Sequence, residues 1–200
     1  MILAVIRHGE TDYNKKGLIQ GNLDIDLNET GINQVIEIAN YLKRADSKWD
    51  QIGSSNLKRA INSAQIIADK LNFKAPFIDL NFNERNFGPF EGKLGREFAP
   101  TIMAADFFHE GFEDNQQLLI RTKRAIKNLH SIYKGNKVLV VTHAHVIRSL
   151  TILSDPIKFQ FNTFEANRIK NSDLYYFEID DDKIHFLKTV SLVDSKVSDI

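Results

Sequence analysis

The sequence predicts an α/β fold in which helices cover both faces of a parallel or mixed sheet. The first observation behind this prediction is a regular alternation of apolar strands and amphipathic helices joined by short links. The second is a pair of continuous apolar runs, 2–6 and 137–142, which are typical of strands buried on both faces. No repeat, low-complexity tract or linker interrupts the 200 residues, so we expect residues 1–200 to form one domain.

Three helices are expected where apolar residues recur at helical spacing. They cover residues 30–44, 57–71 and 115–133. Asn28 and Thr30 are both candidates for the N-cap of the first helix, because each has a side-chain oxygen that can accept from a free backbone N–H.

Shorter apolar runs complete the predicted sheet. Residues 51–54 form a short strand, 76–80 are a candidate strand, and 81–95 are interpreted as loop. Near the end of the chain, two runs with strand-like composition flank Asp181 and Asp182. This pattern is typical of an antiparallel hairpin added at a sheet edge.

Composition and charge exclude several classes of protein. Lys and Arg together number 26, and so do Asp and Glu, so the formal net charge is zero. A neutral protein is not drawn to nucleic acid or to an anionic membrane by its overall charge. The absence of Cys excludes disulfides, thiolate catalysis and Cys-based metal sites. No run approaches the roughly 20 apolar residues of a membrane span, and residues 1–6 are too short for a signal-peptide core. We expect a cytoplasmic protein, either a monomer or a homodimer.

Polar side chains gather where the predicted strands end. Arg7 and His8 follow the first strand, Ser55 precedes the helix that carries Arg59, and His143 follows the second buried strand. Ligands of such folds bind beyond the carboxyl ends of the strands, where helix N-termini also point free N–H groups. Two arginines and two histidines at this edge predict a pocket for a doubly charged oxyanion, for which a phosphoryl group fits best.

Two other interpretations of these residue types stay open. His143 and His145 are spaced like a metal-binding pair, although the acidic ligands that a metallohydrolase needs are not evident nearby. A set of phenylalanines is more often core than binding surface. The set comprises Phe82, Phe87, Phe90, Phe98, Phe107 and Phe108.

Four motifs spread over most of the chain carry a family resemblance. They are RHGETDYN, SSNLKRAINSA, NERNFGPFEG and VVTHAHVIR, in that order. Together they resemble the histidine phosphatase (phosphoglycerate mutase-like) superfamily. The resemblance implies a three-layer α/β/α sandwich with a mostly parallel sheet. It also implies a phosphoric monoester hydrolase that works through a phosphohistidine.

The same resemblance gives roles to individual residues. It implies that His8 attacks phosphorus, that Glu84 is the proton-donating carboxylate, and that Arg7, Arg59 and His143 bind the phosphoryl group. Further substrate-binding positions are expected at Asn14, Gln20, Gly21 and, through its backbone amide at a helix start, Ala144.

The chemistry of the reaction sets physical requirements on these roles. The attacking nitrogen of His8 must be neutral, which Arg7 and Arg59 favour, and the other ring nitrogen needs an acceptor that holds the ring. Charge on the phosphoryl oxygens can be stabilised by the arginines and His143, so neither a metal nor a cofactor is required. Glu84 has to be protonated at the start, so that it can protonate the leaving oxygen and then activate water.

Departures from the family pattern bear on the activity. Mutases of the family carry a long insertion with a paired-arginine motif and a lysine near Gly95, and both are missing here. We therefore expect a metal-independent phosphomonoesterase acting on small phosphorylated metabolites. A cofactor-dependent phosphoglycerate mutase and a non-catalytic phospholigand sensor are the alternatives. His145 stands where many relatives have a small residue, and the sequence does not explain it.

The segment 90–112 interrupts the rhythm of strands and helices at the place where relatives carry a variable lid. We expect a short lid-like insertion here. Its phenylalanines, Phe90, Phe98, Phe107 and Phe108, would face the organic part of a monophosphate ester, with His109 at the edge. The competing interpretation is that these rings are plain core.

Overall fold

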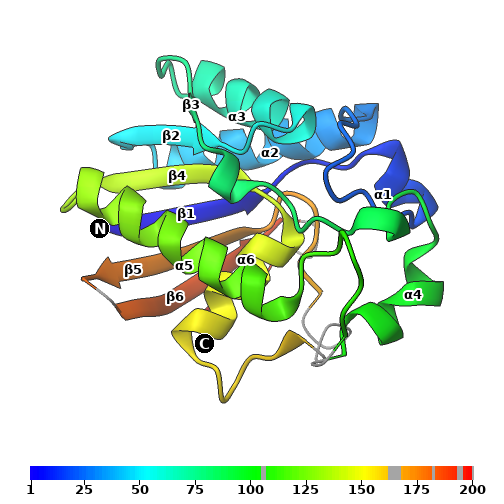
Figure 1. Cartoon of the computed structure of the whole chain (residues 1–200). Coiled ribbons are helices and arrows are strands. Elements are labelled where there is room, and N and C mark those ends of the chain that lie inside the picture. Colours follow the sequence, from blue (N-terminus) through cyan, green and yellow to red (C-terminus); the bar gives the residue numbers. More distant parts are fainter. Residues whose placement is uncertain (105–106, 162–167, 182, 193–195, 200) are drawn as a thin grey trace.

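The computed structural model describes residues 1–104, 107–161, 168–181, 183–192 and 196–199 (Figure 1). Seven strands within these ranges form one mixed sheet in the order β3-β2-β4-β1-β5-β6-β7. The strands are β1 (Ile2–Arg7), β2 (Gln51–Ser54), β3 (Phe77–Ile78), β4 (Lys137–Thr142), β5 (Leu174–Asp180), β6 (Lys183–Ser191) and β7 (Lys196–Asp199). The first four are mutually parallel, and the last three continue the sheet antiparallel from β1.

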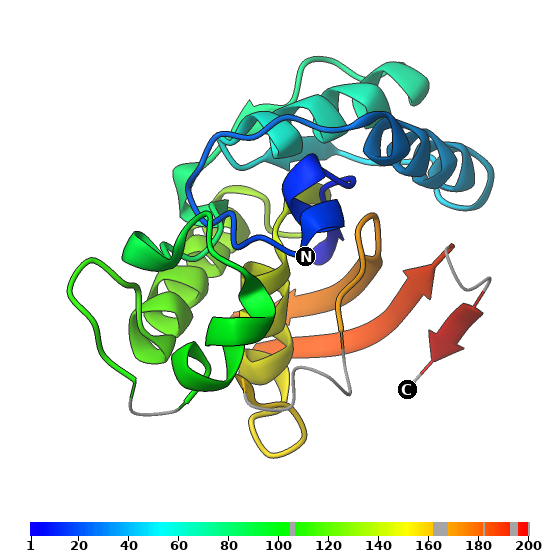
Figure 2. The ribbon, with the colours of Figure 1, turned by 90° about the vertical axis from the view of Figure 1, so that its right-hand side faces the viewer.

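Helices cover both faces of this sheet, which confirms the predicted α/β sandwich. The helices are α1 (Asp12–Lys16), α2 (Glu29–Ala45), α3 (Lys58–Lys70), α4 (Gly95–Ile102), α5 (Asn115–Ile132) and α6 (Ala144–Ser154). Figures 1 and 2 show α2 and α3 on one face and α5 and α6 on the other. The small helices α1 and α4 lie beyond the carboxyl ends of β1 and β4 (Figure 1).

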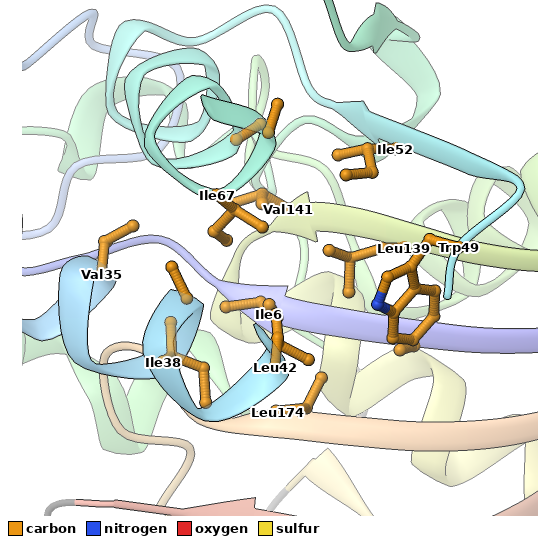
Figure 3. Packing of buried hydrophobic residues seen from close by; sticks show 14 of the residues in the cluster. Ile6, Val35, Ile38, Leu42, Trp49, Ile52, Ile67, Leu139, Val141 and Leu174 are labelled. Carbon is orange, nitrogen blue, oxygen red and sulfur yellow. The ribbon is translucent and has the colours of Figure 1, made fainter. Parts of the chain in front are cut away.

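The central strand β1 is buried on both faces because its side chains alternate between two cores. Ala4 and Ile6 pack with α2 and α3, as Figure 3 shows for Ile6 beside Leu42 of α2. Leu3 and Val5 face the other way, into the core under α5 and α6. This two-sided burial explains why the strand is apolar at every position.

The predicted elements hold with few changes. Strands β2 and β4 have their predicted bounds. Of the two candidates for the N-cap of α2, Asn28 is the one used: its side chain accepts from the N–H of Gly31 at 2.8 Å. The antiparallel hairpin is present as β5 and β6, but it is not the edge of the sheet, since β7 pairs with β6. Helices α1 and α4 were not expected, because they are too short to show a clear apolar period.

The register of the parallel strands decides which polar residues meet. Arg7 of β1 lies beside Thr142 of β4, so the residues that follow them, His8 and His143, are neighbours. Ser55 is added on the other side of β4, where its N–H donates to the Val141 carbonyl at 3.1 Å. Within the described part of the chain, no helix is long and apolar enough to cross a membrane.

Candidate active site

A cavity of about 620 Å³ opens beyond the carboxyl ends of β1 and β4. Most residues expected in the site line it, and they come from distant parts of the chain. These residues are Arg7, His8, Asn14, Gln20, Gly21, Arg59, Glu84 and Ala144. His143 is fully buried and is not among the residues that line the cavity. Its ring centroid is 5.0 Å from that of His8.

The His8 ring is held so that one of its nitrogens, Nε2, keeps an unprotonated lone pair. Its Nδ1 lies 2.7 Å from the Gly9 carbonyl oxygen, which can only accept, so Nδ1 carries the proton and Nε2 a lone pair. Burial lowers the pKa of His8 well below its usual 6.5, and Arg59, His143 and Arg7 lower it further. The ring, which is 2% exposed, is therefore neutral near pH 7, as the attacking role requires.

Arg59 is fixed beside this nitrogen by two backbone carbonyls. Its Nη1 and Nη2 donate to Leu23 and Gly21 at 2.7 Å each, and its Nε donates to His8 Nε2 at 3.3 Å. Burial lowers the pKa of Arg59 to about 10, so the guanidinium stays charged at neutral pH. Gly21 has a φ of +52°, and a Cβ there would collide with Glu91, which explains why glycine occupies this position.

Arg7 and His143 keep buried donors that can serve an oxyanion. Arg7 Nη1 donates to the Ile169 carbonyl at 2.7 Å, while its Nε is buried and has no hydrogen-bond partner among the described residues. His143 Nε2 lies 2.7 Å from the Ser55 hydroxyl, and its Nδ1 has no partner in the same part of the chain. Burial lowers the pKa of both side chains, and for His143 the charge of Arg59 adds to this.

The protonation state of Glu84 differs from the expectation. Burial raises its pKa, but His145, His143 and the backbone N–H of Arg85 together lower it well below 4.5. The Oε1 oxygen accepts from the N–H of Arg85 at 2.8 Å and of His145 at 3.2 Å. The expectation of a protonated carboxyl is therefore wrong for the free protein, because its many nearby donors and cations favour the carboxylate.

Asn14 and Gln20 belong to a network that ties α1 to the end of β1. Asn14 Oδ1 accepts from the Thr11 backbone N–H at 3.2 Å and from Asn171 Nδ2 at 3.2 Å. Gln20 Oε1 accepts from the Thr11 hydroxyl at 2.9 Å, and Asn171 also donates to the His8 carbonyl at 2.9 Å. The amide nitrogen of Asn14 is thus the end of its side chain that can donate to a ligand.

Several residues of the site were missed from the sequence. Asn171 supports the loop after β1, and Arg121 donates to the Asn81 and Asn83 carbonyls at 2.7 and 3.0 Å, just before Glu84. Ser55, which supports His143, was already among the polar residues expected at the strand ends. Cationic residues also line the outer cavity. They are Lys15, Lys16, Arg96 and Arg168. Only the doubled lysine after RHGETDYN gave a sequence signal, because the other positions are brought in by tertiary folding.

The aromatic side chains of the segment 90–112 do not face the described cavity. Phe90, Phe98 and Phe107 pack in a cluster with Phe112, and Phe108 is 77% exposed. His109 is exposed and its ring bonds the Glu110 carbonyl. The core interpretation is therefore right for three of these rings, and the expected contact with substrate is wrong. Aliphatic side chains line the cavity instead, from Leu94, Ala99, Ile102 and Met103.

The metal-pair interpretation of His143 and His145 gains no support. His143 is bonded to a serine hydroxyl, and His145 lies against a single carboxylate, that of Glu84. Across the described ranges, no group of three or more His, Cys, Asp or Glu side chains is placed to hold a metal ion.

The site combines a neutral imidazole, two arginines and a carboxylate at the strand ends of an α/β sandwich. This combination suits phosphoryl transfer. Residues 3–191 match the model of the histidine phosphatase superfamily (branch 1), and the chain belongs to this family. The expected fold family and the expected enzyme class, a histidine phosphatase, are thereby confirmed.

Similar proteins include both phosphatases and mutases. The chain is 36% identical to the uncharacterized phosphatase PhoE of Bacillus subtilis, over 74% of each chain. It is 30% identical to a 2,3-bisphosphoglycerate-dependent phosphoglycerate mutase of Thermoplasma acidophilum, over 97% of this chain and 95% of that one. In structure it is similar to a phosphoserine phosphatase of Entamoeba histolytica, with a TM-score of 0.80, 23% identity, and coverage of 94% and 95%.

Proposed function

We propose that the protein is a metal-independent phosphomonoesterase that hydrolyses small phosphorylated metabolites through a phosphohistidine on His8. The observation that carries this proposal is the His8 ring itself. Its Nδ1–H is held by the Gly9 carbonyl, so Nε2 carries the lone pair, which accepts from Arg59 Nε in the free protein, and the residue lines a cavity that can admit a phosphate ester.

In the first step, His8 Nε2 attacks phosphorus, the P–N bond forms, and the bond from phosphorus to the leaving oxygen breaks. Arg7 Nε, Arg59 and His143 Nδ1 are the donors that bind the phosphoryl oxygens as charge moves onto them. The N-terminal amides of α6 at Ala144 add to this. Glu84 gives its proton to the leaving oxygen, so the product departs as a neutral alcohol.

In the second step, the Glu84 carboxylate takes a proton from water, and the water oxygen attacks phosphorus. The P–N bond breaks, inorganic phosphate forms, and His8 recovers its lone pair. The proton that Glu84 took from water then passes to the departing phosphate, which leaves as the monoanion, so the carboxyl is again ionised in the free protein. Because the carboxyl is ionised in the free protein, we infer that the first proton arrives with the substrate, as the phosphate monoanion.

The cationic lining supports a narrower substrate class. Lys15 and Lys16 of α1, Arg96 of α4 and Arg168 surround the outer cavity, and Glu84 is the acidic side chain in the described lining. A second negative group on the organic part of the substrate, a carboxylate or another phosphate, would be attracted there. We propose the segment 90–112 as a lid that contributes to this selection through Arg96 and the aliphatic residues beside it.

Paired substrates test this class. We expect kcat/KM for 3-phosphoglycerate to exceed that for glycerol 3-phosphate. Combining Lys15→Gln, Lys16→Gln and Arg96→Gln in one protein should reduce the ratio of the two kcat/KM values about tenfold, because three charge pairs are lost and an exposed charge pair contributes about 0.5 kcal/mol. Lys123→Gln, an exposed position on α5 away from the cavity, is the control and should leave the ratio unchanged. Equal kcat/KM values for the two substrates in the unmodified protein would refute the anionic substrate class.

Mutase activity is the second candidate, because a mutase is among the full-length relatives. The missing paired-arginine insertion argues against it. Both His8 and Glu84 face the cavity, which argues against a non-catalytic sensor.

Removal of metals tests the proposed hydrolysis. After treatment with EDTA, the protein should release inorganic phosphate at an unchanged rate, because cationic side chains take the place of a metal at the phosphoryl group. In the presence of 3-phosphoglycerate and a bisphosphate primer, transfer between hydroxyl groups should be minor. Loss of activity that Mg²⁺ restores would contradict metal independence, and efficient transfer would contradict the phosphatase assignment.

A further inference from the structure

His145 takes no part in the two chemical steps, yet it lies beside the group that moves the protons. It is the second residue of α6, the helix whose N-cap is His143. Its side chain is 7% exposed and lines the cavity together with Glu84. A buried imidazole in this place needs an explanation that neither the fold nor the proposed steps supply.

The contacts of His145 converge on one oxygen. Its backbone N–H donates to Glu84 Oε1 at 3.2 Å, and its ring Nδ1 is 3.6 Å from the same atom. The ring is set at this angle by Phe87, whose ring meets it edge-on with centroids 5.0 Å apart. The Ser149 hydroxyl fixes the backbone by donating to the His145 carbonyl at 2.8 Å. The ring is thus packed against the carboxylate from a defined direction.

We propose that His145 is a positioning residue for Glu84. When substrate enters, its Nδ1–H closes the short remaining distance to Oε1 and donates a hydrogen bond that holds the carboxyl in line with the leaving oxygen. This inference rests on the proposed role of Glu84 as general acid. No proton is transferred between the two side chains, so the proton balance of the two steps is unchanged. Catalytic hydrogen bonds are often long before substrate binds and tighten in the complex.

The electrostatic surroundings favour a neutral donor. Burial lowers the pKa of His145 from 6.5, Glu84 opposes this, and Arg85 and Arg148 lower the pKa further. Near pH 7 the ring therefore donates as a neutral imidazole and keeps no charge in the cavity. The charged or titratable groups that act on the pair come from β1, α3, the chain beside Glu84, and α6 with its N-cap; they are Arg7, Arg59, Arg85, Arg148 and His143.

Two substitutions separate the hydrogen bond from the packing. His145→Leu removes the donor but fills the space, whereas His145→Asn keeps an N–H near the place of Nδ1. With a simple alkyl phosphate, we expect His145→Leu to lower kcat/KM at least about tenfold, as for loss of a hydrogen bond to a charged group. With p-nitrophenyl phosphate, whose leaving group needs little protonation, the change should be under about twofold. His145→Asn should restore most of the lost activity.

The Glu84→Gln background provides the cross-check. If His145 acts through Glu84, His145→Leu should add little further loss there. His130→Leu, at another buried histidine on α5, is the control and should leave both substrates unaffected. Should His145→Leu not fold, His145→Ala is judged by the same ratio of the two substrates.

The outcomes are distinguishable. Equal losses on both substrates, or a full additional loss in the Glu84→Gln background, would show that His145 supports the fold rather than the acid, and would overturn the inference. If Glu84→Gln itself fails to discriminate between the two substrates, the general-acid role of Glu84 is wrong. If Glu84→Gln discriminates and His145→Leu does not, only the inference about His145 falls.

Discussion

His8→Ala is expected to lower kcat for every phosphate ester by roughly 10⁴- to 10⁶-fold, as for removal of a covalent nucleophile. The physical reason is that no other described nitrogen in the cavity combines a lone pair with two flanking guanidinium groups. The fold should survive, because among the described residues the His8 side chain bonds only the Gly9 carbonyl and Arg59. Steady-state release of phosphate, with thermal unfolding measured alongside, checks this prediction.

A matched control distinguishes the loss of the His8 side chain from the loss of any buried histidine. His130→Ala removes an equally buried histidine from α5, away from the cavity, and should keep nearly full turnover. If His8→Ala turns over like His130→Ala, the proposed mechanism is wrong.

Glu84→Gln should lower kcat/KM for alkyl phosphates by roughly 10²- to 10⁴-fold, the usual contribution of a general acid. The loss on p-nitrophenyl phosphate should be much smaller, because its leaving group departs without a proton. Glutamine keeps an oxygen that can accept from the N–H groups of Arg85 and His145, so the loop should stay in place. Losses of the same size on both substrates would point to a structural role for Glu84.

The pH dependence of the same reaction follows from the depressed pKa of Glu84. The carboxyl is ionised throughout the neutral range, so the proton for the leaving group enters on the phosphate monoanion, whose second pKa is about 6. For alkyl phosphates, kcat/KM should therefore fall as pH rises above about 6, toward tenfold per unit. In Glu84→Gln this slope should flatten. A rise of kcat/KM between pH 6 and 8 would contradict this account.

Much of the fold could be predicted because its strands and helices have strong local patterns. The apolar runs that became β1 and β4 are buried on both faces, and this leaves no polar position to blur the signal. Helices α1 and α4 gave no such pattern, since five and eight residues span too few turns to show one. Strand β7 pairs with the neighbouring strand β6, but its four residues, Lys196–Asp199, are too few to show a strand pattern in the sequence.

The centre of the site could also be predicted, because parallel strands bring their carboxyl ends to one edge. The register of β1 and β4 places His8 beside His143, as the motifs suggested. The supporting residues could not be found this way: Asn171 and Arg121 act through single side chains from distant segments, and their surroundings exist only in the fold. The predicted protonation of Glu84 was wrong because the donors that favour its carboxylate, the backbone N–H groups of Arg85 and of His145 in α6, meet only in the folded chain.

The segment 90–112 shows where composition alone misleads. Phenylalanines in the segment 90–112 suggested an apolar wall for the substrate, but aromatic rings gain most from burial against one another. Phe90 and Phe107 accordingly pack with Phe112, with their ring centroids 6.0 and 5.1 Å from that of Phe112. The smaller side chains of α4 are left to line the cavity.

The most direct test of the central claim is to trap the phosphorylated protein. Purified protein is mixed with a phosphate-labelled substrate, quenched in alkali within milliseconds, and mapped by peptide mass spectrometry under conditions that preserve phosphohistidine. The account predicts up to one acid-labile phosphate per chain, on the peptide that contains His8, and none in His8→Ala. A label on another residue, or full turnover with no labelled protein at any time, would contradict it.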